Sequence, residues 1–316
     1  MPETTRPARP GQEHYASPVE EVGLGAVDAV KVDEAPSSLW RDAWRELRRR
    51  PMFWVSASLI LLVIVVAAFP SLFTSVDPAY GDLSRSYGEA TTSNPLGFTR
   101  QGQDVYSRII YGARASVSVG VLATICVVLL GGTLGALAGY FGGWLDSLLS
   151  RITDIFFAVP LVLAAIVVMQ VFDASILSVV TVLAVFGWPQ IARITRGAVM
   201  EVKNSDFITA ATSLGSTRLS ILARHVVPNA IAPVIVIATV SLGTFIVAEA
   251  TLSYLGIGLP PSTISWGADI ARAQTGLRTD PSVLFWPAGA LGLTVLSFIM
   301  LGDVVRDALD PKSRKR

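Results

Sequence analysis

Six stretches of this chain lack charged residues and approach the length that a helix needs to cross a bilayer, about 20 residues at 1.5 Å each. They cover residues 52–73, 115–145, 155–172, 174–192, 226–248 and 282–302. The second stretch exceeds one crossing, so we expect a span followed by a glycine-rich turn at 139–143. The third is short, and we expect it to begin near Ile152. The pattern predicts an all-α membrane protein with six transmembrane helices.

The positions of Lys and Arg predict the orientation of these helices, because cytoplasmic flanks of membrane spans are enriched in them. If the N-terminus is cytoplasmic, the segments on its side carry 16 basic residues and the opposite loops carry six. Both termini are therefore expected in the cytoplasm. Residues 1–38 are rich in Pro, Glu and Asp without an apolar period, which predicts a disordered tail. Residues 40–50 are expected to form a basic amphipathic lead-in at the inner surface.

Composition and polar residues exclude several function classes. The chain is 52% apolar and 16% charged, with a net charge of +1, which indicates no nucleic-acid partner. The single Cys126 excludes an intrachain disulfide and a CxxC pair. Neither of the two histidines has an identifiable nucleophile and acid with which to form a catalytic triad. None of the four lysines directly follows a glycine, as the lysine of a phosphate-binding loop does. We expect no catalytic residue, no metal, no cofactor and no unaided ATP hydrolysis.

The loop between the fourth and fifth stretches predicts a short helix over 205–215. Asn204 or Ser205 can cap its start, and Asp206 lies in the first turn, where the helix dipole favours an anion. Gly215 supplies a left-handed stop. One apolar face is expected from the i, i+3, i+4, i+7 spacing of Phe207, Ala210, Ala211 and Leu214. This helix either packs on its own bundle or docks a cytoplasmic partner.

A second amphipathic helix is expected to start at Ser216, with Leu219, Leu222 and Val226 on one side, and to be broken by Pro228.

A few residues within the apolar stretches are candidates for packing or function. Gly131, Gly135 and Gly139 recur every four residues, which permits close approach of another helix, from this chain or a second subunit. Glu249 ends the fifth span, where it is expected either to snorkel to the outer interface or to line a pathway. Gln170, deep in the third span, is expected to hydrogen-bond another helix or to line the pathway.

Several longer motifs resemble the second permease subunit of ABC importers for dipeptides and oligopeptides, a group that also includes nickel permeases. The similar blocks are 94–120 (NPLGFTRQGQDVYSRIIYGARASVSVG), 135–160, 206–229, 249–267 (EATLSYLGIGLPPSTISWG) and 301–312. The EAA motif of that family is matched by Ala210, Ala211, Gly215, Pro228 and Asn229. Thr209 stands where the family usually has Glu, and Asn94, Phe98, Thr99 and Gln103 depart from its outer-loop pattern.

The resemblance implies the type I ABC importer permease (MetI-like) fold over residues 39–316, with a core at about 113–303. It implies a permease subunit in the bacterial plasma membrane that forms half of a pathway by alternating access, most simply for peptides. The implied partners are a homologous second permease, two cytoplasmic ATPases, an extracytoplasmic binding protein and membrane lipid. The ATPase-coupling residues would be Asp206, Phe207, Thr209, Ala210, Ala211, Leu214 and Gly215.

Two alternatives to a peptide permease are compatible with the residues. One is an ABC permease for nickel or another small solute. The other is an ion-coupled carrier or channel, which would need intramembrane acids or broken helices lined up for an ion. The six stretches contain no Asp, Glu, Lys or Arg, which counts against the second alternative.

Overall fold

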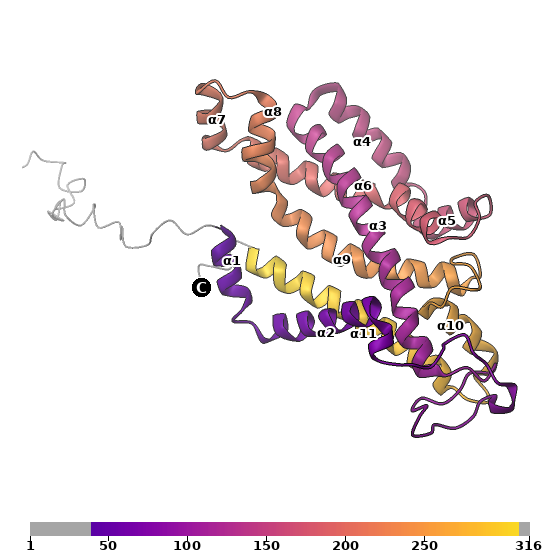
Figure 1. Cartoon of the computed structure of the whole chain (residues 1–316). Coiled ribbons are helices and arrows are strands. Elements are labelled where there is room, and N and C mark those ends of the chain that lie inside the picture. Colours follow the sequence, from indigo (N-terminus) through magenta and orange to yellow (C-terminus); the bar gives the residue numbers. More distant parts are fainter. Residues whose placement is uncertain (1–38, 310–316) are drawn as a thin grey trace, which may run out of the picture. The chain divides into compact units, whose positions relative to one another are not determined.

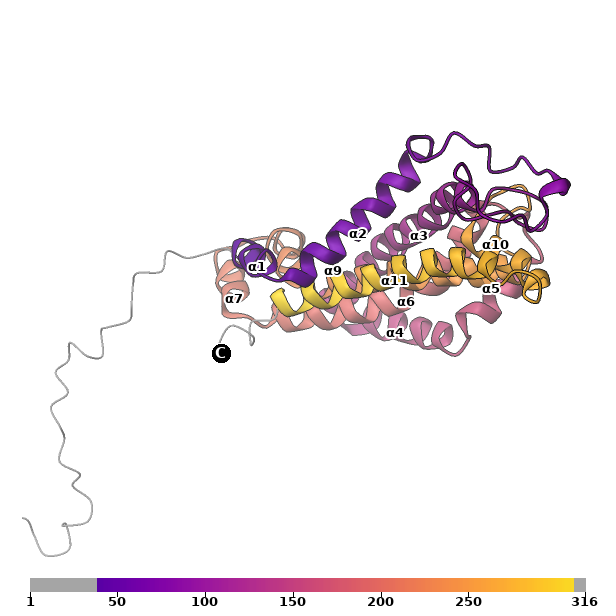
Figure 2. The ribbon, with the colours of Figure 1, turned by 90° about the horizontal axis from the view of Figure 1, so that it is seen from below.

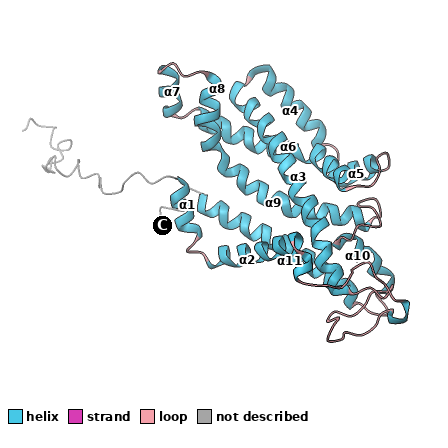
Figure 3. Ribbon diagram, in the orientation of Figure 1, coloured by secondary structure: helices cyan, strands magenta, loops and turns pink. Residues whose placement is uncertain are grey.

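The computed structural model describes residues 39–309, and these fold into helices joined by loops (Figures 1 and 3). The chain divides into two units, 1–42 and 43–316, and only residues 39–42 of the first are described. The predicted tail at 1–38 lies outside the described residues. Helix α1, Leu39–Leu47, falls in the expected lead-in. Within 39–309 the structure contains no strand, only two isolated bridges near the start of α3.

Five helices are long and apolar enough to cross a membrane, or six spans if one bent pair counts as a crossing. These match the six predicted stretches in order. The single helices are α2 (Pro51–Ala68), α3 (Val105–Phe141), α6 (Ile176–Lys203), α9 (Val227–Tyr254) with the α8 segment before it, and α11 (Ser282–Leu309). The bent pair is α4 (Gly143–Phe157) with α5 (Leu161–Met169). Short elements complete the described chain: η2 (Pro70–Leu72), η3 (Leu83–Arg85), α7 (Asp206–Ser213), α8 (Arg218–Ile221), the π-helical η4 (Leu222–Val226), α10 (Trp266–Ala273) and η5 (Gln274–Gly276).

Helix α3 is fixed at both ends by local sequence. The Asp104 carboxylate caps its start by accepting the Ser107 backbone N–H at 2.8 Å. It ends at Gly142, where Gly142 and Gly143 both have positive φ, a conformation that side-chain-bearing residues avoid. The predicted turn at 139–143 is therefore narrower than expected, because Gly139 still belongs to the helix.

The third predicted span is not straight. Its helices α4 and α5 meet at an angle of 79° across Ala158–Pro160. Proline has no N–H to continue a helix and disfavours helical backbone in the residue before it, so Pro160 ends α4 and begins α5. Apolar content alone could not show this bend, because the residues next to Pro160 are apolar on both sides.

The glycines of α3 bring it against α6. A Cβ placed on Gly131, Gly135 or Gly139 would lie 2.3–2.7 Å from the backbone oxygens of Trp188, Ala192 and Arg196 respectively. The two helices therefore touch at backbone level and run in the same direction. Figure 2 shows both among the long helices of the bundle. The prediction of a close helix approach is confirmed, and it occurs within the chain. A buried apolar core from α3, α5, α6 and α9 surrounds this contact.

Helix α9 begins differently from the prediction, because Pro228 does not break it. A π-helical turn over Leu222–Val226 follows α8, and Pro228 lies in the first turn of α9. The Val227 N–H at the end of this turn donates to the Leu222 carbonyl, five residues back, so the wider π-helical spacing accommodates the proline without ending the helix. As a result, residues Arg218–Tyr254 form one continuous helical segment of 37 residues.

Candidate functional site

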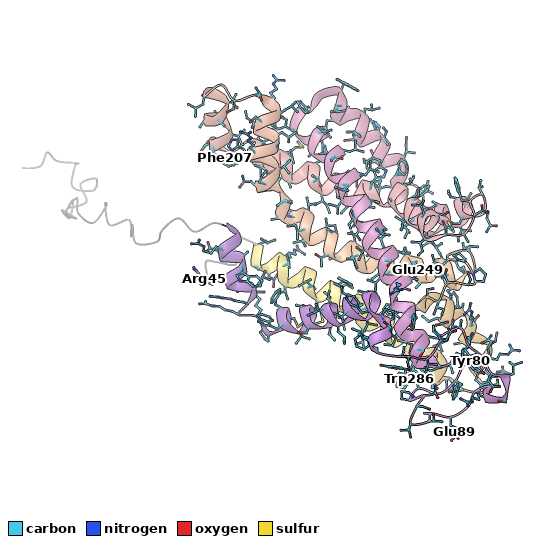
Figure 4. All side chains as sticks on the ribbon, viewed as in Figure 1. Arg45, Tyr80, Glu89, Phe207, Glu249 and Trp286 are labelled. Atoms are coloured by element: carbon cyan, nitrogen blue, oxygen red, sulfur yellow. The ribbon has the colours of Figure 1, made fainter. Side chains whose placement is uncertain are left out.

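The membrane helices carry folded segments at two opposite ends of unit 43–316 (Figure 1). We call the end with α7 and α8 the α7 end, and the end with α10 and residues 69–104 the α10 end. Figure 4 labels Phe207 at the first, and Tyr80 and Glu89 at the second. The predicted helix over 205–215 corresponds to α7, with Ser205 at its N-cap position. The side-chain cap itself is absent, since Ser205 makes no capping bond and Asn204 donates to the Met200 carbonyl.

The two faces of α7 have different surroundings. Phe207, Ala210 and Leu214 are exposed, with Leu214 at 86%. Ile208 is buried, and Ala211 is half-buried beside it. Both contact an apolar cluster formed by the ends of α3 and α6, by α8 and the π-helical turn after it, and by the start of α9: Ala136, Tyr140, Ala198, Val199, Ile221, Leu222, Val226 and Ala230. The exposed face therefore has three apolar members, and a separate face anchors α7 to the bundle.

This arrangement corrects the prediction that Ala211 shares a face with Phe207, Ala210 and Leu214. Ala211 follows Ile208 at i+3, so it points to the bundle. The sequence interpretation overlooked Ile208, although it is apolar and lies in the same helix. Leu219 is also exposed rather than packed with Leu222 and Val226.

Gly215 has the left-handed backbone that the sequence predicted, with φ of +82°. A Cβ at this position would meet no atom within 4 Å. The requirement for glycine is therefore conformational and not steric. It reverses the chain between α7 and α8, whose start is capped by Thr217.

Thr209 lines an open groove between α7, α8 and the ends of α3 and α6. Two cationic side chains, Lys203 and Arg218, line the same groove, together with the hydroxyls of Thr212 and Ser213. Asp206, in the first turn of α7, is exposed. A Glu in place of Thr209 would lie in a groove that contains two cations, and threonine carries no charge to meet them.

The two candidate pathway residues lie elsewhere than predicted. Gln170 is not deep in a span, because it is the exposed C-cap of α5. Glu249 neither snorkels to an interface nor lines a cavity, since its exposure is 0%. Its carboxylate accepts hydrogen bonds from Ser116 at 2.8 Å and Ser253 at 2.7 Å. Figure 4 shows Glu249 where α9 meets α3.

Sequence reasoning missed a buried ion pair at the α10 end. Arg108 of α3 donates to Asp269 of α10 through Nε at 3.0 Å and through Nη2, and its Nη1 donates to the Pro78 carbonyl at 3.1 Å. The side chains of Arg108 and Asp269 are 3% and 10% exposed. Burial raises the pKa of the Asp269 carboxyl, and the charge of Arg108 opposes that shift. The pair links three segments that are distant in sequence.

Other contacts connect the same segments. The Trp266 indole donates to the Ile109 carbonyl at 3.0 Å, and Tyr87 lies so close to Gly276 that a Cβ there would overlap its ring. Asp82 caps η3, and its hydrogen bonds from Ser84 lower the pKa of its carboxyl. Among residues 39–309 no three His, Cys, Asp or Glu side chains gather as metal ligands.

The described part of the chain is a helical membrane bundle with short helices outside it. Comparison with known families gives the class. Residues 131–315 match the family described as binding-protein-dependent transport system inner membrane component. Residues 38–90 match the N-terminal transmembrane domain of oligopeptide transport permease C.

Individual relatives agree with this class over nearly the whole chain. The oligopeptide transport system permease protein OppC of Bacillus subtilis (strain 168) is 35% identical over 94% of this chain and 97% of its own length. The glutathione transport system permease protein GsiD of Escherichia coli O157:H7 is 38% identical over 92% of this chain and 95% of its own. The chain therefore belongs to the permease family of binding-protein-dependent ABC importers, as a multi-pass transport subunit and not an enzyme. This assignment decides against an ion-coupled carrier or channel.

Solved structures agree on the fold. An inward-facing structure of the MetNI methionine ABC transporter aligns with a TM-score of 0.54 over 64% of this chain and 96% of the matched chain. The sequence identity is 19%, so the likeness concerns the fold alone. The predicted type I ABC importer permease (MetI-like) fold is confirmed.

Proposed function

We propose that this chain forms half of a translocation pathway for peptides, with α7 as the coupling helix that a cytoplasmic ATPase receives. A homologous second permease completes the pathway, two ATPases drive it, and a binding protein delivers the substrate. The named relatives belong to systems for oligopeptides and for glutathione, which is itself a tripeptide. That agreement supports peptides over nickel or another small solute.

The observation that carries the coupling role is the division of α7 into two faces. Phe207, Ala210 and Leu214 are exposed on one side, while Ile208 fixes the helix to the bundle on the other. An exposed apolar face of a helix suits a hydrophobic groove on a partner. Because the buried face is anchored, a force applied to α7 reaches α3, α6 and α9 instead of bending a loose loop.

The proposed orientation puts the α7 end and both termini in the cytoplasm of a bacterium, with the chain in its plasma membrane. The 16 basic residues on that side, against six on the other, support it. The α10 end then faces the binding protein. Closure of the ATPase pair would move α7 and shift the bundle between inward-open and outward-open states, which is alternating access.

The test compares tryptophan at two adjacent positions of α7 in the transporter co-expressed with its second permease and ATPases. Ala210→Trp adds bulk to the exposed face, so it should leave thermal unfolding unchanged and weaken ATPase association. Overpacking a close contact costs about 1–3 kcal/mol, or about fivefold to more than a hundredfold in affinity. Association is measured by co-purification at graded ATPase concentrations.

Ala211→Trp is the matched control, because the same bulk is directed into the apolar cluster under α7. It should lower the thermal unfolding midpoint of the permease itself, even without ATPase. Normal ATPase association and normal transport in Ala210→Trp would rule out the exposed face as the docking surface.

A further inference from the structure

The Glu249 side chain lies at a meeting point of three helices. Its carboxylate accepts from the Ser116 hydroxyl of α3 and from the Ser253 hydroxyl one turn further along α9. The Ser116 hydroxyl oxygen in turn accepts the backbone N–H of Trp266, the first residue of α10, at 3.3 Å. We call Glu249, Ser116, Ser253 and the Trp266 N–H the Glu249 junction. It is a continuous hydrogen-bonded link from α9 through α3 to α10.

The helices around the junction pack closely, α9 against α3 through the Ile246 side chain and against α10 at the Ala250 backbone. A Cβ on Gly120 of α3 would lie 2.4 Å from Ile246 of α9, and one on Gly267 of α10 would lie 2.5 Å from the Ala250 backbone of α9. Glu249 and Ser116 are both 0% exposed. The junction therefore excludes solvent, and its hydrogen bonds have no competitor in water.

Packing alone does not call for an acid at this position. Burying a carboxyl group among apolar neighbours costs free energy that a leucine would not cost. The carboxyl adds a directional constraint, because its two acceptor oxygens hold serine hydroxyls of α3, of α9 and of the start of α10 at fixed places. Buried polar groups of this kind can specify one register between elements that apolar contacts would allow to slide.

The helix that carries Glu249 reaches the α7 end. Residues Arg218–Tyr254 form one helical segment of 37 residues, which begins three residues after Gly215 of the α7–α8 turn. Its first turns pack against α7 through Ile221 and Leu222. Near its far end, Glu249 joins it to α3 and α10. One segment thus connects the helix proposed to meet the ATPase with the end proposed to meet the binding protein.

We propose that Glu249 and Ser116 are positioning residues that make α10 and its flanking segments move with α9, so that the state of the ATPases reaches the α10 end. The inference rests on the proposed function and extends it with a specific mechanical connection. A coupling route is established only by measured coupling between its two ends, and the junction provides side chains through which to measure it.

The experiment records, in the assembled transporter, how ATP changes the exposure of the α10 end. The reporter variant carries Thr263→Cys, at a half-buried position two residues before Ser265, the N-cap residue of α10. The second substitution, Cys126→Ser, removes the native thiol. The reaction rate with a membrane-impermeant maleimide is measured without nucleotide and after trapping with ATP and vanadate. We expect the two rates to differ by about fivefold or more, the lower range of allosteric couplings.

Ser116→Ala then removes the hydroxyl that bonds both Glu249 and Trp266 while taking away a single heavy atom. It should reduce the difference between the two labelling rates, because the Ser265 hydroxyl at the start of α10 still reaches the Glu249 carboxyl, and it should leave ATP hydrolysis unchanged. The matched control is Ser297→Ala in α11, also a buried serine, whose hydroxyl bonds only the Leu293 carbonyl of its own helix. It should behave as the reporter background does. Glu249→Gln, which keeps an acceptor, should retain the difference, and Glu249→Leu should lose it.

Three results would overturn the inference. The first is an undiminished rate difference in Ser116→Ala and Glu249→Leu. The second is an absence of any rate difference in the reporter itself, in a transporter that hydrolyses ATP and transports substrate. The third is an equal effect of Ser297→Ala. A wild-type complex that neither assembles with ATPases nor hydrolyses ATP would overturn the proposed function first, and the inference with it.

Discussion

The two ends of the molecule differ in whether their prominent side chains find partners within the chain. At the α10 end, segments more than 150 residues apart hydrogen-bond each other: Arg108 donates to the Asp269 carboxylate, and the Trp266 indole donates to the Ile109 carbonyl. At the α7 end, the apolar side chains of Phe207 and Leu214 point away from the chain. The first end has polar contacts that this subunit makes internally, while the second has an apolar face on α7 that a partner can cover. A lesion at the α10 end should therefore be a folding defect, and one at the α7 end an assembly defect.

The largest effect is expected from Asp269→Ala at the α10 end. It leaves the guanidinium of Arg108, only 3% exposed, without its carboxylate, and breaking a buried ion pair on one side costs about 3–5 kcal/mol. The thermal unfolding midpoint of the purified subunit should fall markedly. The control is Asp154→Ala in the exposed pair with Arg193, which should cost about 1 kcal/mol or less. Equal shifts in both variants would remove the contrast between the ends.

An intermediate effect is expected from Gly215→Val at the α7 end. A β-branched residue at φ of +82° strains the backbone by about 1–2 kcal/mol, although no atom obstructs it. The turn should relax and re-aim α7, so that ATPase association falls while the unfolding midpoint changes little. Gly197→Val, at an unobstructed glycine of α6 without positive φ, should preserve association. If both variants bind ATPase normally, the orientation of α7 does not depend on this turn.

The smallest effect is expected from Thr209→Ala. The Thr209 side chain is exposed on the groove beside α7, and substitutions at such positions change stability by about 0.5 kcal/mol or less. Stimulated ATP hydrolysis should stay close to wild type, because threonine has no charge to offer Lys203 or Arg218. A loss as large as that of Gly215→Val would show that the hydroxyl itself contacts the partner.

Local features of the sequence predicted most of the architecture. Apolar stretches without charges gave the spans, and Gly215 and the α3 glycines were assigned correctly because turns and close approaches depend on residue type. The direction of α7 was only half predicted. Ile208 and Phe207 are both apolar neighbours in a helix of eight residues, so the sequence offers two apolar faces and does not say which one the bundle takes.

The polar interior could not be predicted, because its partners are far apart in the sequence. Ser116 lies 133 residues before Glu249, and Arg108 lies 161 residues before Asp269. An acid next to an apolar run is equally compatible with snorkelling and burial until those partners are known. The break at Pro160 could have been predicted from the sequence, because a proline inside an apolar run breaks or kinks a helix.

The contact between α3 and α6 restricts where this protein can change shape. Their backbones interlock through Gly131, Gly135 and Gly139, which meet the turns of α6 at Trp188, Ala192 and Arg196. Sliding one helix past the other would push these turns into each other. We therefore expect α3 and α6 to move as one rigid pair during the transport cycle. Bending is then left to joints outside this contact, such as the 79° break between α4 and α5 at Ala158–Pro160.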